Sequence, residues 1–483
     1  MQNKIPDSKP SLDYLFQPRS IAIIGVSPDG TKLSAGREFL NSLIDIGFKG
    51  KLYPVRHGGG EVHGLKIYPN ITDIPDSIDY VISAIPAQQN LQLVVDSASK
   101  GAKAMHIFSA GFSEIADVEG AKLESQLMDI ARQKGVRIIG PNCMGLYCPK
   151  TGLAVSRELP KQSGAIGFIS QSGGNTAYAI REGAMRGIYF SKAISYGNAS
   201  DLNECDFLEY LTNDPDTTLI TGYIEGVKEG TRFRETLKRA TQKKPVILYK
   251  AGTTAGGVRA AASHTGSLAG SNEVWEVLLK QEGAIQVHSM EELVDMMLIF
   301  KHMSPPTGRN VALAGVGGGA IVQSADECVD EGLSIPTLPL EIRQKLDELY
   351  TSETGGSFRN PIDMNWAKGD LIRKTIELVT EYEQIDLFMM QILIGIVSNI
   401  ETTRVEPFLE PYIESIIGLS EELRHRTAIV LRPVGMARFW PVALEIKARL
   451  IEADFPVYPS ARRAANAIVK LIEYYQRQSA RQQ

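Results

Sequence analysis

The sequence predicts an α/β protein made of three consecutive Rossmann-like or flavodoxin-like parallel-sheet domains. Its length of 483 residues is that of several domains rather than one. Short runs of apolar and β-branched residues recur along the chain, each followed by a glycine turn and an amphipathic segment. Continuous apolar strands that alternate with helices are typical of a parallel sheet covered on both faces.

We expect domain boundaries at 1–155, 156–303 and 304–483, the last following the linker Ser304-Pro-Pro-Thr-Gly-Arg309. In the first domain, strands are expected at 21–26, 51–55, 80–86, 104–111 and 136–142, and a helix is expected near 89–98. In the other two, they are expected at 165–170, 191–197, 218–225, 245–252, 310–319, 386–395 and 427–435. Ligands of such sheets bind at the carboxyl ends of the strands.

Composition excludes several classes of function. The net charge of −5 gives no electrostatic case for nucleic acid. No apolar run approaches the length of a membrane span, and the polar N-terminus lacks a signal-peptide core, so a cytoplasmic enzyme is expected. The four cysteines form no CxxC pair and the seven histidines no HExxH motif, so neither a disulfide framework nor a metal site is expected.

The most informative segment runs from Ala260 to Ser271 and holds one histidine, His264, among small residues. Small residues leave an imidazole reachable and let backbone N–H groups approach an anion. A helix is expected from Asn272, so the segment is interpreted as a loop that leads to a helix N-terminus, which favours phosphate. His264 is therefore a candidate nucleophile that carries a phosphoryl group. The alternative is a flexible surface loop with an incidental histidine.

Four turns end strands of the first domain. The turn Gly25-Val-Ser27-Pro-Asp-Gly30 suits a phosphate but lacks the GxGxxG dinucleotide fingerprint, so a nicotinamide dehydrogenase has little support. Arg56 could meet a phosphate or adenosine ligand, or could be solvated. Pro86 stops strand pairing and opens a crevice. In Gly140-Pro-Asn-Cys143-Met-Gly145, the cysteine has no identifiable base nearby, so a small buried thiol is favoured over a nucleophile.

Two features of the second domain carry further chemistry. Ser170-Gln-Ser172-Gly173-Gly174 stands at a strand-to-helix turn and could hold a phosphate, although an ordinary serine N-cap is an alternative. It is not the GxSxG elbow of serine hydrolases. Glu225 ends an apolar strand and could accept a hydrogen bond from His264, leaving the other imidazole nitrogen to attack. The alternative is a solvated acid at a strand end.

Taken together, these motifs resemble the α subunit of the NDP-forming acyl-CoA synthetases, the superfamily of ADP-forming acetyl-CoA synthetase and succinyl-CoA synthetase. They are Gly140-Pro-Asn-Cys-Met-Gly, Ser170-Gln-Ser-Gly, Tyr223-Ile-Glu-Gly-Val-Lys and Ser263-His-Thr-Gly-Ser-Leu-Ala-Gly. The likeness runs from about Tyr14 to about Glu473. The third domain, with Gly315-Val-Gly-Gly-Gly and Asn360-Pro-Ile-Asp363, is similar to that of the acetyl-type branch.

The resemblance implies a role for each domain. The first would be a CoA-binding domain, the second a succinyl-CoA-ligase-like domain with the phosphohistidine loop, and the third a ligase-CoA-type domain. His264 would be the phosphorylated residue and Glu225 its partner. The residues implied to bind phosphate or the acyl group are Ser170, Ser172, Gly173, Gly174, Thr265 and Gly266. Those implied to bind coenzyme A are Gly25, Ser27, Val55, Arg56, Ile85, Pro86, Asn142 and Cys143.

The resemblance also implies a reaction that interconverts acyl-CoA, phosphate and ADP with carboxylate, CoA and ATP. It would pass through an acyl phosphate and a phosphohistidine. No ATP-grasp segment precedes Gln483, so ADP or ATP with Mg²⁺ is expected on a partner, an ATP-grasp β subunit in a hetero-oligomer; a homodimer is the other expected assembly. A non-catalytic acyl-CoA-binding regulatory subunit is the alternative function, and the pairing of His264 with Glu225 argues against it.

Overall fold

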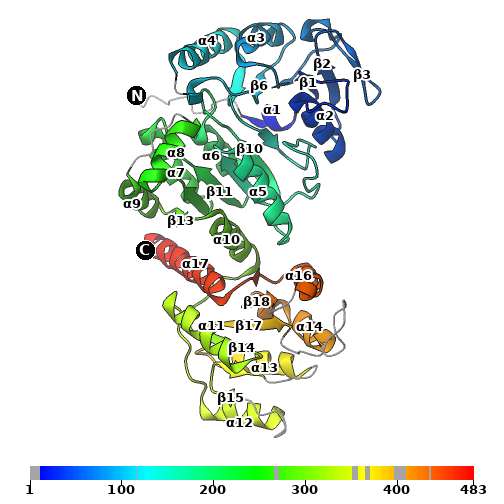
Figure 1. The fold of residues 1–483 in the computed structure, drawn as a ribbon. Coiled ribbons are helices and arrows are strands. Elements are labelled where there is room, and N and C mark those ends of the chain that lie inside the picture. The colour runs from blue at the N-terminus through cyan, green and yellow to red at the C-terminus, as the bar shows by residue number, and fades with distance from the viewer. Residues whose placement is uncertain are drawn as a thin grey trace, which may run out of the picture. The chain divides into compact units, whose positions relative to one another are not determined.

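The computed structural model describes residues 11–115, 117–265, 271–350, 357–364, 370–395, 409–433 and 437–482. The chain forms two compact units (Figure 1). Unit 1 comprises the chain up to Met185 and Tyr189–Leu293, and unit 2 comprises Arg186–Ile188 and the chain from Val294 onward. Within the described residues, no helix is long and apolar enough to cross a membrane.

The first sheet of unit 1 has the order β2-β1-β5-β6-β7, with every neighbouring pair parallel. Its strands are β1 (Ser20–Ile24), β2 (Lys51–Val55), β5 (Tyr80–Ser83), β6 (Ala104–Ile107) and β7 (Arg137–Ile139). The helices are α1 (Asp13–Phe16), α2 (Ala35–Ile46), η1 (Ile71–Asp73), η2 (Ala87–Gln89), α3 (Asn90–Ser99), η3 (Ser113–Ile115) and α4 (Val118–Lys134). A hairpin, β3 (Gly60–Val62) with β4 (Leu65–Ile67), follows β2.

Alternation along β1 explains how this sheet is covered on both faces. Ile21 and Ile23 join the core that contains the apolar residues of α2, whereas Ala22 and Ile24 join the core of α3 and α4. Successive side chains of a strand point to opposite faces, so a strand buried on both sides is apolar throughout. The first strand lies inside the sheet with crossovers to both sides, which creates a switch point between β1 and β5 where ligands bind.

The second sheet of unit 1 has the order β13-β12-β11-β9-β10-β8. Its strands are β8 (Gly145–Tyr147), β9 (Ile166–Ser170), β10 (Phe190–Ser195), β11 (Leu219–Ile224), β12 (Val246–Lys250) and β13 (Ile285–Val287). The helices are α5 (Gly173–Ala184), α6 (Glu204–Asn213), α7 (Gly230–Thr241), α8 (Ala255–Thr265) and α9 (Asn272–Glu282). Helices α6, α7 and α9 share one core with the sheet, and α5 packs on β9 and β10.

The edge strand β8 differs from the parallel pattern that the sequence predicts. It runs antiparallel to β10 and belongs to the second sheet, although only residues 140–144 separate it from β7 of the first sheet. A parallel return needs a crossover of about a dozen residues or more, which this short turn cannot supply. The turn after β7 therefore leads directly from one sheet to the other.

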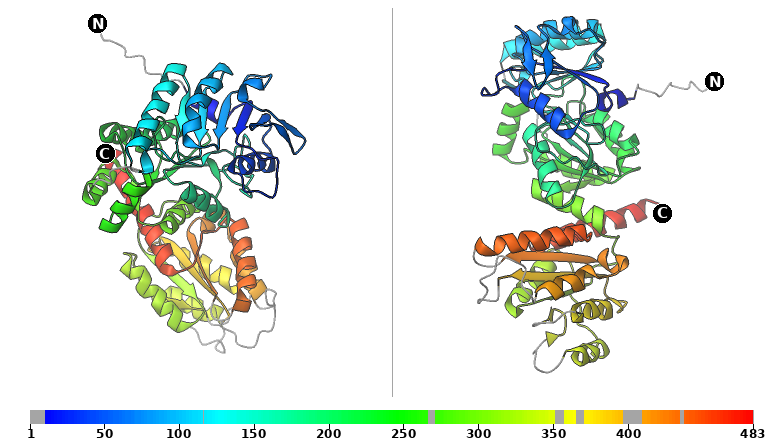
Figure 2. Two further views of the ribbon diagram at one scale, coloured as in Figure 1. Left: turned by 45° about the horizontal axis from the view of Figure 1, so that its top comes forward. Right: turned by 90° about the vertical axis from the view of Figure 1, so that its right-hand side faces the viewer.

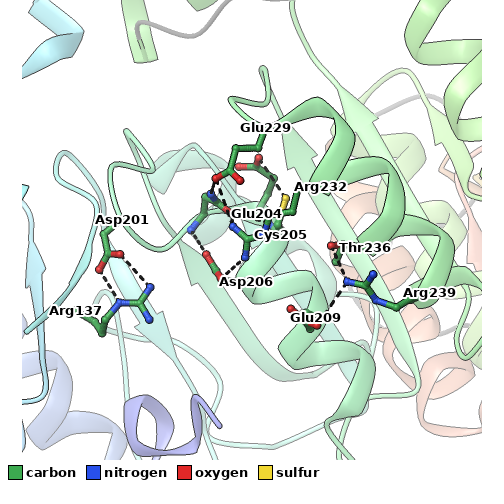
Figure 3. A network of polar contacts seen from close by, with 11 residues as sticks. Arg137, Asp201, Glu204, Cys205, Asp206, Glu209, Glu229, Arg232, Thr236 and Arg239 are labelled. Carbon is green, nitrogen blue, oxygen red and sulfur yellow. Dashed lines mark hydrogen bonds and ion pairs between the residues drawn. The ribbon is translucent and has the colours of Figure 1, made fainter. Parts of the chain in front are cut away.

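A polar network also joins the two sheets of unit 1 (Figure 3). Arg137 at the start of β7 makes a two-pronged ion pair with Asp201, with N–O distances of 2.9 and 3.0 Å. Asp201 also accepts the backbone N–H of Ile138 at 2.8 Å. Close by, Asn203 caps α6, and Arg232 of α7 bonds to Asp206 in the first turn of α6. The loop between β10 and α6 is thus fixed from both sides.

Unit 2 contains the third sheet, in the order β15-β16-β14-β17-β18-β19 (Figure 2). Its strands are β14 (Val311–Gly315), β15 (Ser357–Phe358), β16 (Ile362–Asp363), β17 (Leu387–Ile394), β18 (Thr427–Pro433) and β19 (Val457–Tyr458). Its helices are α11 (Gly318–Asp330), α12 (Leu340–Leu349), α13 (Leu371–Thr380), α14 (Leu409–Ile417), α15 (Glu421–Arg424), η4 (Ala437–Phe439), α16 (Trp440–Glu452) and α17 (Ala461–Gln482). Helix α10 (Met290–His302) joins the units. The predicted fold class is confirmed.

Candidate active site

Three segments expected to bind coenzyme A lie side by side at the carboxyl edge of the first sheet. Gly25 follows β1 and donates its N–H to the carbonyl of Val55 at 2.9 Å, while Ala84 donates to Ile24 at 3.1 Å. A Cβ on Gly25 would lie 2.7 Å from the carbonyl oxygen of Ala84, and the φ of Gly25 is +94°. Only glycine accepts both conditions. The strand order therefore brings Gly25, Val55 with Arg56, and Ile85 with Pro86 to the switch point.

The loop after β1 runs from Gly25 to Ser34, because α2 begins at Ala35. Ser34 closes this loop. Its hydroxyl donates to the carbonyl of Gly25 at 3.0 Å and accepts the N–H of Ser27 at 3.3 Å. Arg37 adds bonds from Nη1 to the carbonyls of Ser27 and Pro28, at 3.0 and 2.8 Å. The loop is thereby preorganised.

Cys143 is a buried thiol, which is the interpretation that the sequence favours over a nucleophile. It is 4 % exposed, and its Sγ contacts the carbonyls of Ile107 and Ile139 at 3.7 and 3.5 Å. Burial raises the pKa of this thiol far above its ordinary value, so the nucleophilic thiolate does not form. The carbonyl of Cys143 accepts a hydrogen bond from His106 at 2.8 Å. Its side chain does not face the switch point.

Asn142 connects the turn after β7 to the second sheet. It lies in the left-handed region with a φ of +57°, and its Nδ2 is 3.4 Å from Oδ1 of Asn198. The Nδ2 of Asn198 donates to Glu114 at 2.5 Å and to Glu124 at 3.2 Å. Asn198, which the sequence analysis did not single out, therefore binds η3 and α4 to the loop after β10.

At the start of α5, Ser172 is the N-cap, accepting the N–H of Asn175 at 3.3 Å. Ser170 accepts the N–H of Ser172 at 3.0 Å and donates to its carbonyl at 2.8 Å. Both hydroxyls thus support the turn itself, as the N-cap alternative predicts. Phosphate binding at this helix start stays a prediction; the first N–H groups of a helix have no acceptor within it.

Gly173 marks where the turn after β7 meets α5. A Cβ on Gly173 would lie 2.3 Å from Cγ of Met144, whose own N–H donates to Ser195 at 3.0 Å. At Gly174, by contrast, a Cβ would meet only the hydroxyl of Ser172, at 3.9 Å. The turn between β7 and β8 therefore contributes Met144 to the immediate surroundings of the α5 N-terminus.

Glu225 is a held and buried carboxylate rather than a solvated acid. Glu225 is 3 % exposed, and its Oε1 accepts a hydrogen bond from the hydroxyl of Tyr223 at 3.1 Å. Its backbone N–H donates to Oε1 of Gln171 at 2.5 Å, and that of Gly226 donates to the same oxygen at 3.1 Å. Gln171 is 4 % exposed and lies between Ser170 and Ser172. The turn after β9 thus fixes the backbone at the end of β11.

Lys250 brings a positive charge to the same edge. It ends β12, which pairs with β11, and is 2 % exposed. Its ammonium donates to the carbonyl of Ala251 and stands 5.4 Å from the ring centroid of Trp275. Burial lowers the pKa of Lys250, and the nearby charge of Glu225 opposes that shift. Within the described residues, no group of three or more His, Cys, Asp and Glu could hold a metal ion.

The segment around His264 differs from the predicted loop, because Ala255–Thr265 form α8. This helix follows β12 and packs against η3. Alanine has the highest helix propensity, and four alanines between 255 and 262 explain the helix. His264 and Thr265 belong to its last turn, and their side chains lie outside what the structure describes. Gly266 lies in the stretch 266–270, outside the described residues.

Two groups of predicted residues therefore gather at two places in unit 1. The first sheet collects the coenzyme A segments, and the second collects Ser170, Ser172, Gly173 and Glu225, beside the strand that leads to α8. The sequence analysis missed Gln171, Tyr223, Asn198 and Arg37. A polar residue inside the Ser-Gln-Ser turn was the available signal for Gln171.

Comparison with known proteins supports this division. Residues 19–149 match the model of a CoA binding domain, and residues 163–300 match the succinyl-CoA ligase like flavodoxin domain. The chain is 34 % identical to acetate–CoA ligase [ADP-forming] II subunit alpha of Pyrococcus furiosus, over 96 % of this chain and 97 % of that one. It is 33 % identical to the corresponding subunit alpha of ligase I, over 96 % and 98 %.

A solved structure agrees along nearly the whole chain. Acetyl-coenzyme A synthetase 1 of Candidatus Korarchaeum cryptofilum, in its apo form, matches with a TM-score of 0.81 at 30 % identity, covering 97 % of this chain and 98 % of that one. Acetate–CoA ligase [ADP-forming] I of Archaeoglobus fulgidus is 31 % identical over 96 % of this chain, which spans 68 % of that protein. The chain therefore belongs to the family of ADP-forming acyl-CoA ligases, and it matches their alpha subunits over nearly its whole length.

Proposed function

We propose that this chain is the catalytic α subunit of an ADP-forming acyl-CoA ligase. It would interconvert acyl-CoA, phosphate and ADP with a carboxylate, free CoA and ATP. The relatives that match nearly the whole chain are ligase subunits by name, which favours an enzyme over a regulatory acyl-CoA-binding subunit. Four buried cysteines without a disulfide suit a reducing cytoplasm.

The proposed reaction has three steps. A phosphate oxygen attacks the thioester carbonyl, the C–S bond breaks, and the CoA thiol leaves with a proton. An imidazole nitrogen of His264 then attacks phosphorus, and the bond to the acyl oxygen breaks to release the carboxylate. Finally a terminal oxygen of ADP takes the phosphoryl group from the imidazole and gives ATP. Such transfers depend mainly on positioning and on stabilisation of charge.

The buried Glu225 is the observation that carries this proposal. Glu225 is 3 % exposed, its carboxylate accepts the Tyr223 hydroxyl and its backbone N–H donates to Gln171, and this carboxylate has no evident role in packing. It directly follows β11, which pairs with β12, the strand from which the chain enters α8 and reaches His264. An ionised carboxylate there can orient an imidazole and stabilise its cationic phosphorylated form.

We propose that the nucleotide step needs a second polypeptide with an ATP-grasp fold, which would bring ADP or ATP and Mg²⁺. Two relatives of similar extent are named as subunits, whereas the Archaeoglobus protein is longer than the part that this chain matches. Both arrangements agree with a ligase whose second half lies beyond the matched region. Two copies of this chain would also be able to form a homodimer while each binds the ATP-grasp partner.

The test measures acid-labile labelling of the full chain with ³²P-phosphate and acyl-CoA, using acetyl-, propionyl-, 4-hydroxybutyryl- and feruloyl-CoA in turn. We expect His264→Ala to abolish labelling while the Kd for CoA changes less than twofold. His288→Ala is the matched control, since His288 is exposed and its hydrogen bond to Glu292 comes from the backbone N–H, which alanine keeps. Labelling of the His264→Ala variant at the wild-type level would reject the role of His264.

A further inference from the structure

The side chain of Tyr223 forms a hydrogen bond with that of Glu225. The two residues stand two apart at the end of β11, so their side chains leave the strand on the same face. The Tyr223 hydroxyl is 3.1 Å from Oε1 of Glu225 and donates its proton to the carboxylate. A carboxylate accepts hydrogen bonds only, so this fixes the direction of the bond.

The side chain of Asn175, in the first turn of α5, acts on the same hydroxyl as a donor and opposes the rise in the pKa of Tyr223. Since its proton is directed to Glu225, the Tyr223 oxygen accepts from the amide of Asn175. Asn175 is itself fixed, because its backbone N–H donates to the N-cap Ser172. A directed chain of hydrogen bonds therefore runs from the start of α5 through Tyr223 to Glu225.

Other titratable groups lie at the ends of strands in the same sheet. Tyr223 is half-buried on β11, Lys250 ends β12, and Tyr196 follows β10. Burial, and then the charge of Glu225, raises the pKa of Tyr223, so its hydroxyl keeps the proton that it donates. The hydroxyl thus remains a donor to Oε1 of Glu225.

We propose that Tyr223 is a positioning residue for phosphoryl transfer, because its hydroxyl sets the direction of the Glu225 carboxylate relative to the N-terminus of α5. This inference rests on the proposed roles of Glu225 and His264. Through Asn175, the carboxylate keeps a fixed relation to the helix start at which the phosphoryl group would be bound. Loss of the hydroxyl removes one hydrogen bond from the Glu225 carboxylate without removing any charge.

The chain offers a matched control in Tyr249. It pairs with Tyr223 across β11 and β12, and the two rings meet edge to face with centroids 5.3 Å apart. Tyr249→Phe and Tyr223→Phe each remove one hydroxyl from the same aromatic pair, but only the second removes the bond to Glu225. A purely structural role of the pair would affect both variants alike.

The experiment measures the rate constant of His264 labelling as a function of pH, with ³²P-phosphate and whichever acyl-CoA labels the wild-type chain fastest. For Tyr223→Phe, we expect a rate at least tenfold lower at pH 7 and an unchanged KM for acyl-CoA. The loss should appear in kcat at every pH of the profile, because the hydroxyl positions the carboxylate without binding acyl-CoA. Tyr249→Phe should stay within twofold of the wild type.

Wild-type rate and pH profile in Tyr223→Phe, or equal losses in both tyrosine variants, would overturn the inference. Thermal unfolding of both variants identifies a loss that comes from stability alone. His264→Ala, run in parallel, separates the two proposals. If it still labels, the proposed function fails; if it does not label and Tyr223→Phe behaves as the wild type, only the role of Tyr223 fails.

Discussion

His106 shows how a single buried side chain positions the turn between the two sheets of unit 1. It ends β6, is 1 % exposed, and donates from Nε2 to the carbonyl of Cys143 at 2.8 Å. A Cβ on Gly145 would lie 2.6 Å from its Nδ1, so the ring presses directly on the turn backbone. Phe39 of α2 contacts it edge to face. The imidazole is thus enclosed on all sides.

This enclosure predicts a pH-dependent stability. Burial lowers the pKa of His106 from 6.5 to about 4. Above pH 6.5 the ring is neutral in both states; between 6.5 and 4 only the unfolded chain binds the proton, so stability falls as the pH falls. Its contribution between pH 7 and pH 5 is about 2 kcal/mol. In urea unfolding, His106→Gln, which keeps a donor for Cys143, should lose less stability over this interval.

His63→Gln is the control for this prediction, since His63 is exposed and bonds to Asn41 on the surface. Its unfolding free energy should follow the wild-type dependence on pH. His302 is also buried with a pKa lowered to about 4, chiefly by burial, so part of the slope remains in every variant. A slope in His106→Gln equal to that of the wild type would show that His106 does not titrate in this way.

At the residue scale, the character of a single residue was easier to predict from the sequence than its contacts with other residues. Glu225 and Cys143 could be judged from local context, because a strand-end acid and a cysteine in an apolar turn have few plausible roles. The bonds of Glu225 to Tyr223 and Gln171 could not, because Gln171 comes from a different strand. Those contacts depend on the pairing of β9 with β11, which residue types alone do not specify.

At the scale of elements, the parallel strands were predictable and the irregular pieces were not. A strand buried on both faces leaves a continuous apolar run, so β1, β9 and β14 are evident in the sequence. The β3–β4 hairpin and β8 are only three residues per strand and lack such a run. The first half of the predicted loop, from Ala260 to Thr265, instead belongs to α8, because small residues are compatible with a helix as well as with a loop.

The packing of α2 gives a prediction at this scale. A Cβ on Gly36, the second residue of α2, would lie 2.6 Å from both the carbonyl carbon and the oxygen of Gly25. Backbone cannot yield as a side chain can, so Gly36→Ala should displace the helix from the coenzyme A loop. We expect a loss of about 1–3 kcal/mol in stability and weaker CoA binding. Urea unfolding and calorimetric titration with CoA measure the two effects.

Gly174→Ala is the matched control, because Gly174 is likewise the second residue of its helix, α5. The space around it is open apart from Ser172, so alanine should leave stability unchanged or raise it by about 0.5–1 kcal/mol. CoA affinity should also stay at the wild-type value. Equal CoA affinities of Gly36→Ala and the wild type would contradict the close-packing argument.

At the scale of the molecule, the three-domain division remains a prediction, while the chain forms two compact units. The first two sheets share one apolar core that includes Ile23 of β1 and Ile169 of β9. Periodicity along a sequence identifies sheets, but it does not tell which sheets pack on a common core. This is why the two family models that match separately, at 19–149 and 163–300, lie within one unit.

Residues 186–188 belong to unit 2 although the chain on either side of them belongs to unit 1. Arg186 explains this, because its Nη1 bonds to Asp295 of α10 at 2.5 Å. Arg463 of α17 completes the site with bonds of 2.5 and 2.8 Å to the two Asp295 oxygens. The Asp295 and Arg186 side chains are each 5 % exposed and that of Arg463 is 33 % exposed, so one carboxylate bonds to two arginines at a largely buried site.

Removing the carboxylate of a buried ion pair takes away the counter-charge of its partners, which costs about 3–5 kcal/mol. Asp295→Ala should therefore destabilise unit 2 by that amount, and hydrogen exchange should quicken for the β14 and β17 amides while those of β1 stay protected. Asp330→Ala, which breaks an exposed pair with Arg462, should leave exchange unchanged. Uniform acceleration in all three strands would mean that the units unfold as one, and that Asp295 supports the whole chain rather than unit 2.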